Sequence, residues 1–283
     1  MGRLPFVLVA SLALAAPATA QPTPAPAPVQ DPAQLRACLQ RFAVAGLPRH
    51  RSENGTLEQR RPVICRRGYA LSFNLRTLNP DWVIERLTPA DLKGPASRSN
   101  HFLSDDLLGE RGPRDSEYDK SGFDRGHQAP AGDAKFNQTV MDQSFYLSNI
   151  SPQVGIGFNR GQWKFLEEEI RAWVLCGGRT DVIVMTGPIF GDGAATVAGR
   201  IRVPAAYYKI VYDVRSQRAV GFRLPNARLA LGDVGKYAVP IAEIENETGL
   251  DFFPALPRRR QTQLEAAAGA VWGHGQACNS IGE

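Results

Sequence analysis

The sequence lacks long apolar runs and dense clusters of charge of one sign. After the first twenty residues no stretch of 18 consecutive apolar residues occurs, so we expect no transmembrane helix in the mature chain. The formal net charge is +5, which falls to +4 once Arg3 is removed with those twenty residues. Ordinary soluble proteins reach this value, so a nucleic-acid partner is compatible with the charge but not required by it. The longest basic run, Arg258–Arg260, is interpreted as a solvated turn.

Cysteine is scarce, and the four residues are Cys38, Cys65, Cys176 and Cys278. None forms a C-x-x-C pair, which argues against a zinc site. In an exported chain an even number favours two disulfides, for which three connectivities exist. We favour Cys38–Cys65 and Cys176–Cys278, and the second pair would tie the C-terminal tail to a central helix.

The N-terminus has the pattern of a secretory signal peptide. Arg3 supplies the positive charge, a short apolar stretch follows, and Ala18-Thr19-Ala20 is a small-residue cleavage site. We therefore predict a signal peptide over residues 1–20 and export of the mature chain. The sequence leaves open whether the destination is the periplasm or the medium.

One folded domain is expected after a short spacer. Gln21–Pro32 holds five prolines and predicts an extended linker. No internal repeat and no second Pro- or Gly-rich linker follows, so residues 33–283 are predicted to form a single domain.

Apolar patterning predicts an α+β fold. Strands are expected over 68–74, 82–87, 181–187, 206–214 and 219–224, the last two joined by a turn at 215–218. Helices are expected over 159–174, over 239–249 with Gly249 as the stop, and over the alanine-rich 263–272. Strands and helices do not alternate strictly, which favours α+β over a doubly wound sheet.

The predicted helix beginning at Asn159 has a mixed face. Its apolar residues fall within one arc of about 100° on a helical wheel. Glu167 and Arg171 lie beside this arc, together with Arg160 and Lys164. The simplest alternative makes Asn159 an N-cap and Glu167–Arg171 an i,i+4 salt bridge.

The stretch Asp124-Arg125-Gly126-His127 can supply catalytic chemistry. Histidine accepts a proton near neutral pH, and glycine permits close approach of a ligand. The amide of Asn159 offers a hard oxygen to Mg²⁺, and arginines can stabilise the charge of a phosphate. Together these groups suffice for metal-assisted hydrolysis of a phosphodiester.

Two other site types have weaker support. The spacing Gly155-x-Gly157-x-x-x-Gly161 does not fit the dinucleotide-binding motif G-x-G-x-x-G. The serines near His127 lack a G-x-S-x-G elbow, which argues against a serine hydrolase.

Several blocks resemble, in order, the DNA/RNA non-specific endonuclease family, which includes endonuclease G. The chain is similar to it in Arg98–Asp105 (R-x-x-x-F-x-x-D), Gly122–Gln153, Phe158–Arg171, Thr186–Phe190, Leu224–Asn226 and Val239–Pro254. The resemblance covers about 95–255 and implies a ββα-metal (His-Me finger) nuclease fold, with a central antiparallel sheet flanked by helices.

The resemblance also implies roles for individual residues. His127 would be the general base, and Asn159 the one direct protein ligand of Mg²⁺, with Mn²⁺ as an alternative ion. Glu167 would hold a water of the metal ion in place.

Four further roles follow from the same resemblance. Arg98 would stabilise the transition state and Arg171 would assist, although Arg171 lies about 18 Å along the helix from Asn159. Arg125 would contact substrate or structure, and Asp124 would orient the hairpin that carries the histidine.

The leading hypothesis is an exported endonuclease that contacts the phosphate backbone of DNA and RNA. The alternatives are a non-catalytic nucleic-acid-binding protein on the same scaffold and a nuclease toxin controlled by an inhibitor protein. A homodimer remains open, and no membrane partner is expected after signal cleavage.

Overall fold

The computed structural model describes residues 30–52 and 60–273. The predicted signal peptide, residues 21–29 of the spacer and Cys278 lie outside these ranges.

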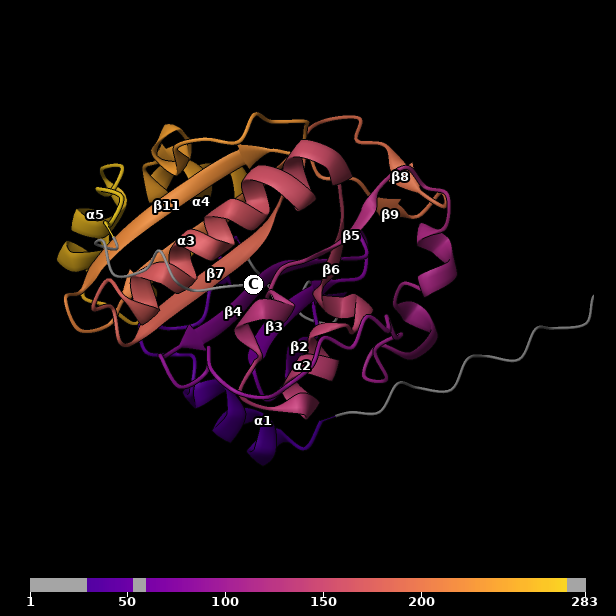
Figure 1. Ribbon diagram of the computed structural model, residues 1–283, viewed down its shortest axis with the longest axis horizontal. Helices are drawn as coiled ribbons and strands as arrows, with labels where there is room; N and C mark the ends of the chain where they lie inside the picture. Colours follow the sequence, from indigo (N-terminus) through magenta and orange to yellow (C-terminus); the bar gives the residue numbers. More distant parts are fainter. Residues whose placement is uncertain (1–29, 53–59, 274–283) are drawn as a thin grey trace, which may run out of the picture.

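A seven-stranded sheet forms the centre of the molecule (Figure 1). Its strand order is β12-β11-β10-β7-β4-β3-β2, and every neighbouring pair is antiparallel. The strands are β2 (Val63–Cys65), β3 (Tyr69–Asn74), β4 (Asn79–Leu87), β7 (Val182–Ile189), β10 (Ala206–Asp213), β11 (Arg218–Pro225) and β12 (Ala238–Val239). The predicted α+β fold with a central antiparallel sheet is confirmed.

All five strands predicted from patterning are present, with ends shifted by a few residues. β10 and β11 pair over their full length, from Ala206 opposite Pro225 to Asp213 opposite Arg218. β7 is buried at every position, as its continuous apolar run predicted.

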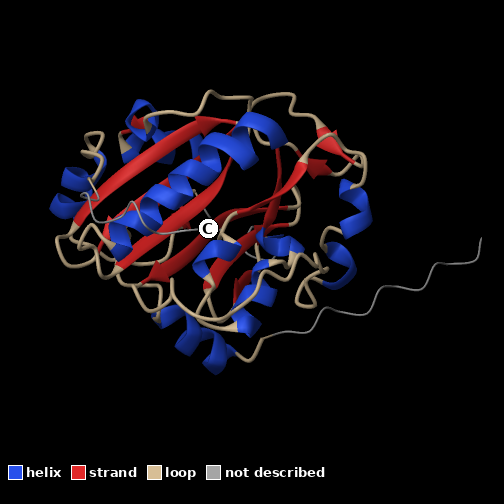
Figure 2. Ribbon diagram, in the orientation of Figure 1, coloured by secondary structure: helices blue, strands red, loops and turns tan. Residues whose placement is uncertain are grey.

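Helices cover both faces of the sheet (Figures 1 and 2). They are α1 (Pro32–Gln40), α2 (Gln138–Ser144), α3 (Trp163–Leu175), α4 (Ile241–Thr248) and α5 (Arg258–Glu265). On one face α3 packs through Trp163, Leu166, Ile170, Trp173 and Val174, the residues of its predicted apolar arc. On the other face α1, α4 and α5 contribute to a second core.

Three short antiparallel pairs lie outside the main sheet. They are β5 (Asp124–His127) with β6 (Ile150–Gln153), β1 (Arg49–His50) with β13 (Leu250–Asp251), and β8 (Thr196–Val197) with β9 (Ile201–Arg202). The β5–β6 pair lies beside the start of α3 and carries the D-R-G-H residues (Figure 1).

The C-terminal helix differs from its prediction. α5 begins at Arg258, so Arg258–Arg260 form its first turn rather than a loop, and it ends at Glu265. The alanine-rich stretch beyond it is not helical because the chain packs closely there. A side chain at Gly269 would meet the carbonyl oxygen of Ala219 at 2.2 Å, and Trp272 packs edge-on against Trp173. The predicted α4 stop is confirmed, since Gly249 has a φ of 71°.

The N-terminal helix was missed. α1 begins at Pro32, where proline is tolerated, and Asp31 caps it by accepting from the backbone of Ala33 and Gln34. Ordered structure therefore starts before residue 33. The disulfide Cys38–Cys65 joins α1 to β2, as predicted.

Within the described residues, no helix combines the length and the apolar character that a membrane crossing needs.

Candidate active site

The antiparallel pair of strands β5 and β6 fixes the position of His127. Asp124 pairs with Gln153 and His127 with Ile150, so these two candidate site residues lie at opposite ends of one short strand. Gly126 is required between them, because a Cβ there would approach Cδ of Gln153 to 2.1 Å.

His127 is enclosed by aromatic rings. Its imidazole meets Phe145 edge-on with 4.8 Å between ring centroids, and Phe102 lies at 5.6 Å. Nε2 is shielded from solvent and has no hydrogen-bond partner in the described part of the chain. Burial, and secondarily the charge of Arg98, lowers the pKa of His127 from 6.5 to about 3. The ring is therefore neutral near physiological pH.

The segment after His127 is held by Asn149, which the sequence did not single out. The Asn149 side chain accepts from the backbone N–H of Ala129 and donates to the Ala129 carbonyl, both at 2.9 Å. It also donates to the carbonyl of Ser144 at 2.8 Å. Because these contacts join residues far apart in the sequence, no local pattern marked them. Asn149 thereby fixes the exit of the strand that carries His127.

Arg98 lies at the edge of the same aromatic group. Its guanidinium is 5.1 Å from the centre of the Phe145 ring, and its Nε donates to Oδ1 of Asn100 at 2.7 Å. Burial lowers the pKa of Arg98, while the charge of Glu167 raises it. The charge of Arg98 thus acts on the imidazole of His127, and the charge of Glu167 acts on Arg98.

The segment Gly155–Gln162 brings Asn159 to the β5–β6 pair. The prediction that Asn159 begins the helix is wrong, because Gly157 has a φ of 87° and α3 starts only at Trp163. The N-cap alternative is wrong for the same reason. Instead, Nδ2 of Asn159 donates to Oδ2 of Asp124 at 2.9 Å, and Arg160 pairs with the same carboxylate. This bond turns the amide oxygen away from Asp124 and leaves it for a cation.

Arg125 is engaged by acidic residues rather than turned toward His127. It donates to Oδ1 of Asp115 at 2.5 Å and to Oδ1 of Asp119 at 2.7 Å. Its guanidinium also lies 5.6 Å from the rings of Phe102 and Tyr118. Arg125 therefore supports the wall behind His127.

The charged side of α3 faces the segment that follows His127. Nη1 of Arg171 pairs with Oδ1 of Asp133 at 2.8 Å, rather than with Glu167 as in the alternative interpretation of the helix. Gly132 allows this approach, since a Cβ there would lie 2.9 Å from Nη1. Burial raises the pKa of Glu167 to about 7, against the opposing charges of Lys209 and Arg171. Like Asn149, Asp133 was not predicted, because its partner is distant in sequence.

A separate acidic cluster is unrelated to this site. Glu245 on α4, Asp251 on β13 and Glu265 at the end of α5 lie close together, on the other face of the sheet. Arg51 pairs with Glu245, and Arg49 pairs with Asp251. These carboxylates are thus partly neutralised and distant from His127.

Comparisons with known proteins agree with this arrangement. A model of the family described as DNA/RNA non-specific endonuclease matches residues 48–259. Nuclease C1 of Cunninghamella echinulata var. echinulata is 39% identical over 214 residues, which cover 69% of this chain and 84% of that protein. Mitochondrial endonuclease G of Homo sapiens is 32% identical over 222 residues, covering 72% and 74%. A chain from the crystal structure of the EndoG/EndoGI complex has a TM-score of 0.69 and 28% identity, covering 78% of this chain and 94% of that one.

Proposed function

Because this chain belongs to the DNA/RNA non-specific endonuclease family, we propose that it hydrolyses the phosphodiester bonds of DNA and RNA with the help of Mg²⁺. Nuclease activity is what the relatives share by name. The observation that carries the proposal for this chain is the strand β5. It holds the histidine at one end and, at the other, the carboxylate that orients the amide of Asn159.

The donor set near Asn159 fits a hard divalent cation. One amide oxygen is free to bind, Asp124 lies beside it, and the remaining positions would be filled by water, as Mg²⁺ prefers. Mn²⁺ accepts the same oxygen ligands. When bound, the ion would neutralise negative charge on the phosphate.

His127 takes a proton from the attacking water. Since Nε2 is shielded, we assign Nδ1 as the accepting atom, with the proton of the neutral ring on Nε2. A base works best when its pKa is near the working pH, and Arg98 contributes to the low pKa of His127. An anionic phosphate beside Arg98 would offset this contribution and make the imidazole more basic when substrate is bound.

The remaining charged residues act on the phosphate or support those that do. Arg98 lies next to His127 and stabilises the extra negative charge of the transition state. Glu167, whose charge acts on Arg98, would orient water at the ion. Arg171 assists from its position against Asp133, and Arg125 holds the aromatic wall.

The proposed substrates follow from what this site can recognise. A base, a cation and arginines act on phosphate, which DNA and RNA share, so neither sugar nor base is selected. The name of the Nuclease C1 relative supports a nuclease that acts on nucleic acid. The EndoG/EndoGI complex, whose subject is EndoG inhibition, supports control by an inhibitor protein. Export after cleavage of the signal peptide rests on the N-terminal sequence alone, and the quaternary state is left to measurement.

A cleavage assay tests this function. Purified mature protein is incubated with supercoiled plasmid and, separately, with structured RNA in Mg²⁺, in excess EDTA, and in EDTA followed by excess Mg²⁺. Cleavage of both substrates should stop in EDTA and return with Mg²⁺. Binding of either nucleic acid without cleavage under any condition would favour the non-catalytic alternative, and full cleavage in EDTA would exclude the metal-dependent mechanism.

A further inference from the structure

Lys209 is a buried lysine in the middle of the central sheet. Its side chain is 1% exposed, on β10, and its ammonium donates to Oγ1 of Thr186, the residue directly opposite on β7, at 2.8 Å. Lysine is almost never fully buried without a partner, because removing its charge from water is costly. The hydroxyl, one long hydrogen bond to a carbonyl and one ring face offset only part of this cost, so nearby negative charges are needed as well.

The ammonium lies between the two halves of the proposed active site. It is 4.9 Å from the centre of the Trp163 ring, in the first turn of α3, and 3.5 Å from the carbonyl oxygen of Gln128, the residue after His127. Lys209 points to the α3 face of the sheet, as do its alternate neighbours Tyr207 and Val211. Lys209 therefore contacts α3, which carries Glu167, and the residue that directly follows β5, which carries His127. Its side chain does not reach the surface.

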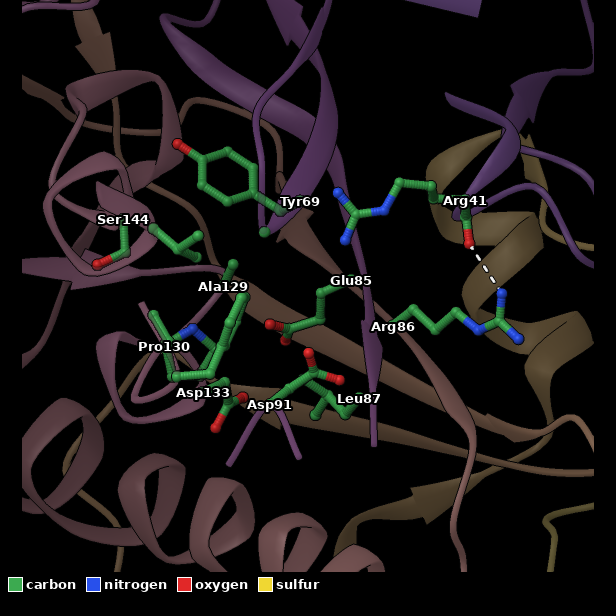
Figure 3. A pocket seen from close by; sticks show the side chains of 14 residues that line it. Arg41, Tyr69, Glu85, Arg86, Leu87, Asp91, Ala129, Pro130, Asp133 and Ser144 are labelled. Carbon is green, nitrogen blue, oxygen red and sulfur yellow. Dashed lines mark hydrogen bonds between the residues drawn. The ribbon is translucent and has the colours of Figure 1, made fainter. Parts of the chain in front are cut away.

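Glu85 is a buried carboxylate on the same face of the sheet as Lys209, two residues along β4 from the partner of Thr186. Glu85, on β4, is 4% exposed, and Asp133 is 8% exposed and pairs with Arg171. Figure 3 shows Glu85 and Asp133 at one small cavity of about 20 Å³, which is also lined by Pro130 and has room for about one water molecule. Glu167 completes the group because it lies one helical turn after Trp163 on α3, on the side of the helix that the Lys209 ammonium meets. The charge of Lys209 opposes the effect of burial on the pKa of Glu167.

The charges of this group balance if one carboxylate keeps its proton. Among the described residues, the group beneath α3 holds three carboxylates, Glu85, Asp133 and Glu167, and two cations, Lys209 and Arg171. Arg98 also acts on Glu167 but is exposed, so its charge is screened by solvent and is not counted here. Burial, and next the charge of Asp133, raises the pKa of Glu85 well above its usual range. A neutral Glu85 leaves Arg171 to balance Asp133, its ion-pair partner, and Lys209 to balance Glu167.

We propose that Lys209 is a positioning residue of this nuclease, the buried counter-charge that favours the ionised form of Glu167 and holds its carboxylate in place. The inference rests on the proposed function, since Glu167 is assigned there to orient water at the metal ion. Lys209 itself touches neither substrate nor metal. A buried charge that served stability alone could be replaced by an apolar side chain together with its partner, often without loss.

Steady-state cleavage of plasmid by three proteins tests this role. Lys209→Met removes the charge and keeps the length of the side chain. Its kcat should fall about 10- to 100-fold, as for residues that orient a catalytic group, and KM should change by less than about twofold. Glu85→Gln is the matched control, because it has the shape of the protonated acid, and its kcat should stay near that of the wild type.

The double variant Lys209→Met/Glu85→Gln isolates the effect of the lysine. It fixes residue 85 in the neutral form, so a loss of kcat relative to Glu85→Gln comes from removal of the lysine charge alone, and a urea midpoint measured for each variant shows that the proteins compared are folded. A folded double variant with low kcat supports the inference, and one with wild-type kcat overturns it. In a Glu167→Gln background, Lys209→Met should have little further effect on residual kcat, whereas a fully additive loss contradicts action through Glu167.

Failure of the proposed function and failure of the role of Lys209 give different experimental results. A wild-type protein without nuclease activity would refute the proposed function. An active wild type whose kcat is unchanged by Lys209→Met would leave that function intact and refute the role of Lys209.

Discussion

His127 should remain neutral in the folded, metal-free protein far below the pH at which an exposed histidine is protonated. His127 is 9% exposed, and its ring is packed against Phe102 and Phe145. Arg98 adds a nearby positive charge. Both influences disfavour the imidazolium, and together they lower the pKa from 6.5 to about 3.

This shift has a calculable effect on stability. A fall of about 3.5 in pKa corresponds to about 5 kcal/mol of free energy of unfolding, at about 1.4 kcal/mol for each pKa unit. Because the folded-state pKa is depressed, the contribution is fully present above about pH 6.5 and is lost as the pH falls toward 3. Glu167 acts in the opposite sense. Its raised pKa contributes stability at low pH that is lost as the pH rises toward about 7.

The assay must therefore isolate His127 from Glu167. Urea unfolding is measured between pH 8 and pH 4.5 for the wild type and for His127→Phe, which keeps an aromatic ring against Phe145 and cannot be protonated. From pH 6.5 to 4.5 the wild type should lose about 2 kcal/mol relative to the variant, while the contribution of Glu167 cancels. Nitrogen NMR of the His127 ring reports its charge directly. A titration midpoint near 6.5, with parallel stability curves for the two proteins, would refute the burial argument.

Three other expectations concern the scaffold and the processing of the chain. Gly126→Ala should lower the melting temperature and abolish plasmid nicking, because the new carbon would collide with Gln153, whereas Gly232→Ala, which meets nothing within 4 Å, should do neither. Replacing Cys38 and Cys65 by serine should lower the free energy of unfolding by about 3–4 kcal/mol in urea titrations, since the disulfide closes a loop with a sequence separation of 27; an unchanged midpoint would contradict this. Mass spectrometry of the exported protein should find a chain that starts with the glutamine after the predicted signal peptide and has no reactive thiol when denatured without reductant, and an intact initiator methionine would exclude the signal assignment.

Local periodicity predicted the parts of the fold that depend on neighbouring residues. Every residue of the predicted apolar arc of α3 lies in the core. Each end of the paired strands β10 and β11 lies within one residue of its predicted position. Gly249 ends α4 as predicted, because a left-handed residue is needed there. These features follow from side-chain spacing and backbone preference alone.

Contacts between distant segments explain what the sequence did not reveal. Asn159 was expected to begin a helix, yet its amide is held by Asp124, 35 residues earlier in the chain. The ion pair of Arg171 with Asp133 and the burial of Lys209 depend in the same way on how α3 packs on the sheet and the β5–β6 pair. A local pattern assigns such charged residues to the surface, so their grouping emerges only from the folded structure.

A titration with Mg²⁺ at fixed pH tests the division of labour between His127 and Asn159 most directly. Turnover of plasmid is measured for the wild type, His127→Ala and Asn159→Ala across the full range of Mg²⁺ concentration. His127→Ala should lose at least about 100-fold in turnover at every concentration, because the proton acceptor is gone. Asn159→Ala should recover part of its activity as Mg²⁺ increases, because the substitution weakens binding of the ion. Near-normal turnover of His127→Ala, or its recovery by Mg²⁺, would contradict the assignment of His127 as the base.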